Sequence, residues 1–450
     1  MPVICEKIEE IKLEKAESGA TFLKLENGLT LIHQEIPTTA VVSVDIWVQA
    51  GTTSEPEEWA GMAHFLEHMI FKGTQNILPG EFDIVIESQG GIANAATSLD
   101  YTHFMFTTAA NHFSLTLPYL ADMLLNASIP DDEFDQERQV VIEEIRQALD
   151  DPDWLAYQQL METVYENHPY SRSVLGSVEV LEQLTPAQMR AYHRHHYHPK
   201  QMTVAIVGAI AQAEAVEIVS AAFEHRDAFV SLSMDATIAA SQVHAPMNVA
   251  NDRPKAKVNI TGIRRHQEQL PRLQHSRLTM AWLGASVDSL EDALCLELIS
   301  VILAEGRSSR LVRELREELG WVQDIGSGFT MQKEPGLFTI SAYLDDSYLE
   351  PVEHKILHHV AQLSTTLVTD AELDRAKRSL CNNFAFSLES PNQLASFLGY
   401  HGLLGCEDLC ANWATIYCDL IRRVQPSDIK ALAQKYLSPE HYAIASLIPI

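Results

Sequence analysis

The chain has 450 residues, of which 46% are hydrophobic and 21% are charged, and its formal net charge is −29. This length exceeds what one hydrophobic core usually serves, so two or three domains are expected. The negative charge argues against nucleic acid and anionic membrane surfaces as partners, and no apolar run approaches the roughly 20 residues that span a bilayer.

The six cysteines are sparse for this length and have no partners at zinc-ribbon spacing. We therefore expect reduced thiols, as in a cytoplasmic protein. The acidic N-terminus has neither the apolar core of a signal peptide nor the composition of a transit peptide, which favours the same location. The negative charge would attract basic peptides, although it serves solubility equally well.

The first predicted elements are strands. Residues 21–25 and 29–33 alternate apolar and polar positions on either side of Asn27-Gly28, which is a strong hairpin signal. Residues 40–48 predict a third strand.

A helix predicted over residues 59–71 carries His64 and His68, which are four residues apart and therefore lie on one face. Two imidazoles in this relation can hold one zinc ion, each through a ring nitrogen at roughly 2.0–2.1 Å. Glu67 comes one residue before His68, the reverse of the common zinc-peptidase order. A carboxylate there can take a proton from water, whose pKa zinc lowers to roughly 7.

An extended segment over residues 91–97 and a return strand over 102–109 follow the predicted zinc helix. Taken by themselves, these residues predict an ordinary sheet edge. A helix is then expected over residues 113–125.

The acidic helix predicted over residues 131–149 supplies candidates for the third ligand that a catalytic zinc requires. Glu137 and Glu144 are seven residues apart, so they share a helix face. Either carboxylate can meet the histidine pair if the two helices pack together.

A histidine-rich run at residues 193–198 lies between a helix predicted over 154–165 and a strand predicted over 202–207. Its four histidines have no ordered spacing on one face, and Pro199 ends the helix. We therefore assign this run no metal-binding role.

The sequence becomes polar and irregular after Glu224, which marks a linker. We predict an N-terminal zinc-binding domain over residues 1–228, a linker over 229–257 and a C-terminal domain over 258–450.

The second half repeats the layout of the first. An offset of 239 residues aligns the acidic helix with a later one, and an offset of 240 aligns the last helix and strand of each half. Both halves share the order helix, proline-led helix, helix, proline and strand, which predicts two domains of like fold.

The metal ligands are not repeated in the second half. Ala376 stands at the position equivalent to Glu137, and Asn383 stands at that of Glu144. Residues 295–303, opposite the zinc helix in the layout, contain no histidine pair. We therefore expect one Zn²⁺ per chain.

These motifs resemble those of the pitrilysin/insulinase family of zinc peptidases, and within it the smaller processing-peptidase branch. The family pattern is His-x-x-Glu-His followed by Glu-x6-Glu, and here His68 and Glu144 are 76 residues apart, as in the family. The flanking Gly-x-Ala-His and His-Met-x-Phe-Lys-Gly-Thr also match. The resemblance implies zinc ligands at His64, His68 and Glu144. It implies a general base at Glu67 and a second acidic residue of the catalytic site at Glu137.

The resemblance also implies an α+β fold of two homologous α/β-roll domains, each with a mixed or antiparallel sheet packed with helices. The two domains would close like a clam-shell around a chamber that admits peptides or unfolded segments. Residues 91–104 resemble the family's Asn-Ala-x-Thr edge strand, which takes substrate as an added strand. Asn94 and Ala95 are therefore candidate substrate-binding residues.

Residues 305–320 resemble the family's Gly-x-Ser-Ser-Arg-Leu…Leu-Arg-Glu…Gly signature. In fully equipped members the Arg, here Arg316, is followed seven residues later by a Tyr, and the pair reaches the substrate and the developing oxyanion. This chain has Gln323 at the Tyr position. The resemblance then implies a zinc-bearing subunit whose related partner supplies the Arg/Tyr pair. The alternative is a homodimer or monomer in which Gln323 donates a hydrogen bond in place of the missing Tyr.

A non-catalytic assembly or scaffold subunit is the rival function from another class. Such relatives commonly lose ligands of the zinc motif, whereas all five residues are intact here. We therefore predict a metalloendopeptidase.

Overall fold

The computed structural model describes residues 8–9, 19–224 and 258–450, which form two compact units. Unit 1 comprises Met1–Ile145, Ser173–Pro254 and Ser387–Ala414, and unit 2 comprises Arg146–Arg172, Lys255–Phe386 and Thr415–Ile450. The predicted linker over 229–257 lies outside the described residues. The domain boundaries at 228 and 258, and the closure of two domains around a chamber, stay predictions.

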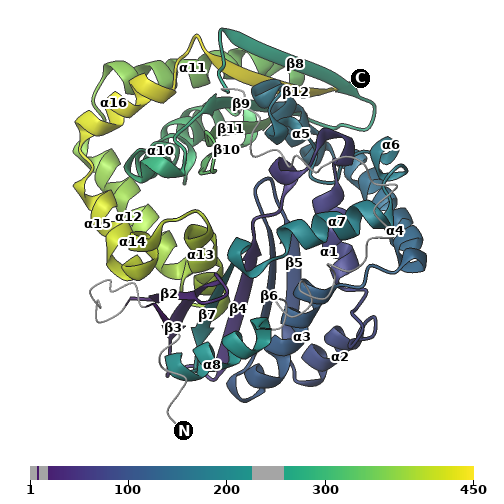
Figure 1. Cartoon of the computed structure of the whole chain (residues 1–450). Helices are drawn as coiled ribbons and strands as arrows, with labels where there is room; N and C mark the ends of the chain where they lie inside the picture. Colours follow the sequence, from purple (N-terminus) through teal and green to yellow (C-terminus); the bar gives the residue numbers. More distant parts are fainter. Residues whose placement is uncertain (1–7, 10–18, 225–257) are drawn as a thin grey trace. The chain divides into compact units, whose positions relative to one another are not determined.

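Unit 1 is built on a seven-stranded mixed sheet (Figure 1). In spatial order its strands are β1 (Ile8–Glu9), β2 (Thr21–Leu25), β3 (Thr30–Glu35), β7 (Met202–Gly208), β4 (Val41–Val48), β6 (Thr102–Ala109) and β5 (Ile92–Thr97). β3 and β7 are parallel and the other neighbours are antiparallel. β5 therefore lies at one edge of the sheet.

The predicted hairpin and the strands that follow it are confirmed. Gly28 has a φ of 86°, which favours glycine, and the Asn27 side chain accepts a hydrogen bond from the Leu29 amide at 3.0 Å. β2 and β3 pair antiparallel across this turn. In β4 every residue after Val41 is buried, as expected for a central strand covered on both faces.

The helices predicted over residues 59–71, 113–125 and 131–149 are confirmed as the first, third and fourth α-helices of the chain. The helices of unit 1 are α1 (Met62–Ile70), α2 (Glu81–Ser88), α3 (Phe113–Asn126), α4 (Asp131–Leu149), α6 (Val178–Leu181), α7 (Pro186–His196), α8 (Gln212–Phe223), α13 (Pro391–Leu403) and α14 (Glu407–Ala411). α4 continues past Ile145 into unit 2. α1 begins three residues later than predicted, because Glu57–Trp59 forms a 3-10 helix and Gly61 has a left-handed φ of 92°.

Unit 2 contains a five-stranded sheet with the same connectivity. Its spatial order is β10 (Val322–Thr330), β11 (Leu337–Leu344), β9 (Ser276–Leu283), β12 (Tyr442–Pro449) and β8 (Ile263–Leu270). β8 and β12 are parallel, as β3 and β7 are in unit 1. The predicted α+β fold with two like domains is therefore confirmed, and β10 corresponds to the edge strand β5.

The helices of unit 2 are α5 (Pro152–Tyr165), α10 (Leu290–Ala304), α11 (Leu349–Thr365), α12 (Asp370–Ser387), α15 (Trp413–Arg423) and α16 (Pro426–Tyr436), together with a π-helix over Val312–Glu318. α5 comes from the first half of the sequence but packs on β9 and β12. α13, its counterpart in the repeat, comes from the second half and packs on β4 and β7 of unit 1. The two halves thus exchange one helix each.

No helix among the described residues combines the length and apolarity needed to cross a bilayer. The five cysteines in the described part of the chain are free thiols.

Candidate metal centre

Helix α1 is held at its N-terminus by a buried carboxylate. The Glu55 side chain accepts hydrogen bonds from the backbone amides of Gly61 at 3.1 Å and Ala63 at 2.7 Å. It thereby satisfies two of the amide donors that a helix start leaves without partners. Phe65, Leu66 and Met69 pack into the core of unit 1, which fixes the rotation of the helix about its axis.

Helix α4 places a carboxylate on its apolar face. Phe134, Val141 and Ile145 repeat at helical spacing and are buried, and Glu137 is buried with them. A carboxylate on an apolar stripe is unusual, since it is rarely buried without a partner. Glu144 lies further along the same helix and its side chain is 43% exposed.

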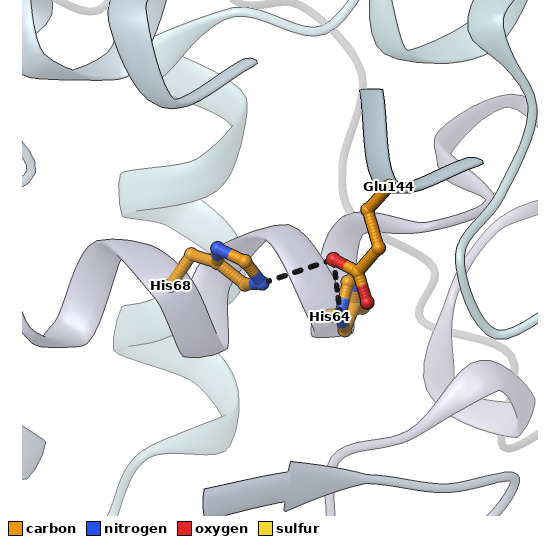
Figure 2. A group of neighbouring side chains, drawn as sticks. All are labelled: His64, His68 and Glu144. Carbon is orange, nitrogen blue, oxygen red and sulfur yellow. Dashed lines mark ion pairs between the residues drawn. The ribbon is translucent and has the colours of Figure 1, made fainter. Parts of the chain in front are cut away.

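The structure brings together the three residues predicted as zinc ligands (Figure 2). Glu144 Oε2 lies 3.6 Å from His64 Nε2 and 3.5 Å from His68 Nε2. The ligand atoms of the three residues all lie within 4.8 Å of one another, and no other described group of three such side chains does so. In a tetrahedral zinc site with bonds of about 2.1 Å, ligand atoms are about 3.4 Å apart, which is close to the two distances to Glu144.

Glu137 lies on the other side of the His68 ring. Its Oε1 is 2.8 Å from His68 Nδ1, and its Oε2 is 2.5 Å from Lys72 Nζ. A carboxylate behind a ligating imidazole fixes the ring orientation and leaves the second nitrogen free for the metal. The structure therefore places Glu137 where it orients His68, outside the group of three ligand atoms.

The two histidines have opposite pKa shifts. Burial, together with the charge on His68, lowers the pKa of His64 to about 4, so the ring is neutral at pH 7, as a zinc ligand must be. Burial also lowers the pKa of His68, but its hydrogen bonds to Glu137 and Glu144 outweigh this and raise it to about 9. A proton on the His68 ring therefore balances the negative charge of the two carboxylates. A bound cation would replace that proton.

The same hydrogen bonds act on the two carboxylates. The bond to His68 lowers the pKa of Glu137, with help from Lys72, and lowers that of Glu144. Both groups are therefore ionised at neutral pH. Two imidazoles and one carboxylate are a donor set that catalytic zinc prefers, and a water molecule would take the fourth position.

Glu67 lies on α1 between the two histidines and is held by the edge strand. Thr97 Oγ1 donates to Glu67 Oε2 at 2.6 Å, and Thr97 Oγ1 is 3.1 Å from Thr102 Oγ1. Burial raises the pKa of Glu67, while the bond from Thr97 lowers it. This environment keeps the carboxylate available as a proton acceptor that is more basic than a free glutamate.

The predicted substrate-binding residues lie on two different elements. Asn94 and Ala95 belong to β5, whose one neighbour in the described part of the sheet is β6. Arg316 lies on the π-helix of unit 2, and its guanidinium donates to Glu317 at 3.1 Å and to Asp324 at 3.2 Å. Gln323 lies at an irregularity of β10 between the paired residues Val322 and Asp324, and its Nε2 lies 2.8 Å from His275 Nε2. Substrate contact by these residues stays a prediction.

Three residues of this region were not predicted from the sequence. Lys72 was part of the matched Phe-Lys-Gly-Thr flank, and Thr97 was part of the matched edge strand, so both carried a signal. Glu55 lies in a loop without periodicity, and its role depends on the fold of that loop back to α1.

Two comparisons with family sequence profiles cover most of the chain. Residues 30–178 match "Insulinase (Peptidase family M16)", and residues 183–380 match "Peptidase M16 inactive domain".

Individual relatives extend the similarity along the chain. An uncharacterised zinc protease of Mycobacterium leprae is 28% identical over 382 residues, covering 85% of this chain and 82% of the relative. A probable mitochondrial-processing peptidase subunit beta of Arabidopsis thaliana is 27% identical over 440 residues, covering 95% and 78%.

A solved structure of a protease from Helicobacter pylori has a TM-score of 0.84 at 24% identity, covering 96% of this chain and 99% of that one, which shows a common fold. The profiles, the relatives and the fold agree with the resemblance drawn from the motifs. The chain therefore belongs to the insulinase family of zinc peptidases, peptidase family M16.

Proposed function

We propose that this chain is a zinc-dependent endopeptidase that cleaves peptides or unfolded segments. The observation that carries the proposal is the meeting of His64, His68 and Glu144 within 4.8 Å, with Glu67 on the same turn of α1. A single Zn²⁺ per chain is proposed, held by these three side chains. When bound, zinc would polarise the scissile carbonyl and lower the pKa of a water molecule to roughly 7.

Glu67 acts as the general base in this proposal. Its carboxylate takes a proton from the attacking water and passes it to the nitrogen of the leaving amine. The bond from Thr97 occupies Oε2 and holds the group in one orientation, while burial raises its pKa towards the working pH. Glu137 orients His68 and does not itself touch the substrate.

The substrate is proposed to add to the sheet at β5, beside Asn94 and Ala95. The exposed residues of β5 and its position at the edge support this, because an edge strand offers unpaired backbone groups to an extended peptide. Backbone pairing gives affinity with little sequence selectivity, so many peptides would be accepted.

The chain is further proposed to work as the zinc-bearing subunit of a heterodimer with a related chain that carries an Arg/Tyr pair. The support is the change at position 323: Arg316 is present, but Gln323 replaces the Tyr and its amide already contacts His275. A homodimer in which Gln323 donates to the substrate is the competing arrangement.

Peptide cleavage by the purified chain, with and without a chelator, tests the enzymatic proposal. We expect cleavage of an unstructured peptide to stop on zinc removal and to return when zinc is added. Glu67→Gln should keep zinc but cleave about 10²- to 10⁴-fold more slowly, since a general base contributes about that much. The matched control is Glu87→Gln, an exposed glutamate on α2 that should cleave as the wild type does. Undiminished turnover by zinc-loaded Glu67→Gln would refute the assignment of the base.

The heterodimer is tested by adding a related chain that carries both the Arg and the Tyr. We expect the turnover rate to rise on the order of 10²-fold, because one lost oxyanion donor costs about that much. The control is the same related chain with its Tyr replaced by Phe, which should give a smaller increase. Full activity of this chain alone, unchanged by the related chain, would contradict the proposal.

A further inference from the structure

Helix α13 belongs to the second, metal-free half of the sequence but packs directly on the sheet of unit 1 (Figure 1). Leu394, Ala395 and Leu398 join a buried cluster with residues of β2, β3 and β7. Two glycines bring the helix backbone close to the sheet. A Cβ on Gly399 would lie 2.2 Å from Trp47 Nε1, and one on Gly402 would lie 2.2 Å from Ile32 Cδ1. A side chain at either position would have to displace Trp47 or Ile32, so the two glycines allow the helix to lie close to the sheet.

The residue after Gly399 completes an aromatic cluster of Trp47, Tyr101, His103 and Tyr400. The Tyr400 ring centroid is 5.6 Å from Trp47 and 5.6 Å from Tyr101. Trp47 in turn lies 4.6 Å from Tyr101 and stacks on His103 at 4.2 Å. His103 Nδ1 is 3.0 Å from the buried carboxylate of Asp45, which fixes the ring at the base of the cluster.

The aromatic cluster contacts the turn that joins β5 to β6. Tyr101 lies in this turn, and its carbonyl accepts a hydrogen bond from the Ser98 amide at 2.8 Å. Thr97 and Thr102 are register partners in β5 and β6, and their hydroxyl oxygens are in contact at 3.1 Å. The Thr97 hydroxyl donates a hydrogen bond to Glu67 Oε2 at 2.6 Å. Contacts thus run without a break from Tyr400 through Tyr101 and the turn to Glu67.

We propose that Tyr400 is a positioning residue for Glu67. The inference rests on the proposed role of Glu67 as the base. Without the Tyr400 ring, Tyr101 keeps Trp47 and His103 as ring neighbours, but the turn that follows Thr97 loses this contact with α13. A displacement of about 1 Å at a catalytic group can cost about 10²-fold in rate. The metal ligands lie on α1 and α4, so their geometry does not depend on this turn.

The test compares Tyr400→Ala with Tyr400→Phe and Phe397→Ala in the full chain. Phe397 lies one turn earlier on α13 and packs against the buried cluster, so its loss weakens the docking of α13 without removing the contact to Tyr101. The readouts are kcat and KM for peptide cleavage, bound zinc, thermal stability, and amide hydrogen exchange of residues 98–102. Tyr400→Leu, which keeps an apolar side chain at the site, replaces Tyr400→Ala if the latter does not fold.

We expect Tyr400→Ala to lower kcat roughly 10-fold or more, with KM and bound zinc within about twofold of wild type. Exchange at residues 98–102 should become faster. Tyr400→Phe keeps the ring, so its kcat and its exchange at residues 98–102 should equal those of the wild type. Phe397→Ala should lower thermal stability but keep kcat.

Wild-type kcat in Tyr400→Ala, or an equal loss of kcat in Phe397→Ala, would overturn the inference. A wild-type protein without zinc-dependent cleavage would instead overturn the proposed function. Hydrogen exchange needs no activity, so it separates the two failures: unchanged exchange in Tyr400→Ala refutes the support of the turn by Tyr400 in either case.

Discussion

His68 lies between two carboxylates that have different roles. Glu144 faces Nε2 together with His64, whereas Glu137 bonds Nδ1 and is itself paired with Lys72. The ring is therefore held from behind and presents one nitrogen to the group of three ligand atoms. In the proposed site, one ring nitrogen of His68 would bind the metal and the other fixes the orientation of the ring.

Glu137→Gln tests this division of roles. The amide cannot carry the charge that holds Nδ1 protonated, so the orientation and basicity of the His68 ring both suffer. We expect zinc affinity to fall about 10- to 100-fold, the usual cost of losing such a partner. Competition with a chelator of known affinity measures this directly. The matched control is Glu133→Gln. Glu133 lies on the same helix as Glu137, and its carboxylate is 3.8 Å from Lys72 Nζ. This variant should bind zinc nearly as the wild type does.

Much of the site could be predicted from residue spacing alone. His64 and His68 had to share a helix face, and Glu67 had to lie beside them. Spacing could not separate Glu137 from Glu144, because residues seven apart share a face, and that distinction came from the family pattern. Glu55 escaped prediction because its partners Gly61 and Ala63 are reached only after the loop folds back.

The helices that correspond in the repeat, α4 and α12, differ in what their inner faces hold. In α12, Asn383 and Ser379 both donate to Glu305 Oε1 at 2.8 Å. Asn383 is the counterpart of Glu144, so in unit 2 a hydrogen bond to Glu305 is made at the position that the candidate ligand has in unit 1. The start of the helix is closed by Thr369 and Glu372 in a reciprocal cap.

Glu372→Gln tests the stability of this helix start and has a defined pH dependence. Burial raises the pKa of Glu372, but bonds from Arg310 and Thr369 outweigh it and lower the pKa to about 2. Because the pKa of the folded state is below that of the unfolded chain, the ionised group stabilises the fold above pH 4.5, and this contribution is lost as the pH falls towards 2.

We expect Glu372→Gln to lower the free energy of unfolding at pH 7 by about 1 kcal/mol, the usual value of a helix cap. The difference should shrink below pH 4.5. Urea unfolding at several pH values measures it, with Asp374→Asn, an exposed residue of the same helix, as the control. A difference that is independent of pH would contradict the assignment.

The order of strands and helices could be predicted because alternation and helical periodicity are local. The Asn27-Gly28 turn and the acidic start of α4 are examples. The exchange of α5 and α13 could not be predicted, because amphipathicity specifies that a helix packs on a sheet but not on which sheet. The glycines of α13 lie against Trp47 and Ile32, which are far from α13 in the sequence.

At the scale of the whole molecule, one architecture appears twice and carries one candidate metal centre. The strand order of the five shared strands is the same in both units, yet the described residues contain a single group of three potential ligands, all in unit 1. Unit 2 keeps Arg316 instead, on the π-helix. The two units therefore share a strand order and differ in the candidate functional residues that they carry.

The central claim is that His64, His68 and Glu144 hold one zinc ion, and metal analysis of purified variants tests it most directly. After dialysis against limiting zinc, the wild type and Glu143→Gln, the exposed neighbour on α4, should each retain about one zinc per chain. Glu144→Gln should bind zinc at least about 10-fold more weakly, because a neutral amide replaces an anionic ligand. If Glu144→Gln retains zinc with wild-type stoichiometry and affinity, the claim is wrong.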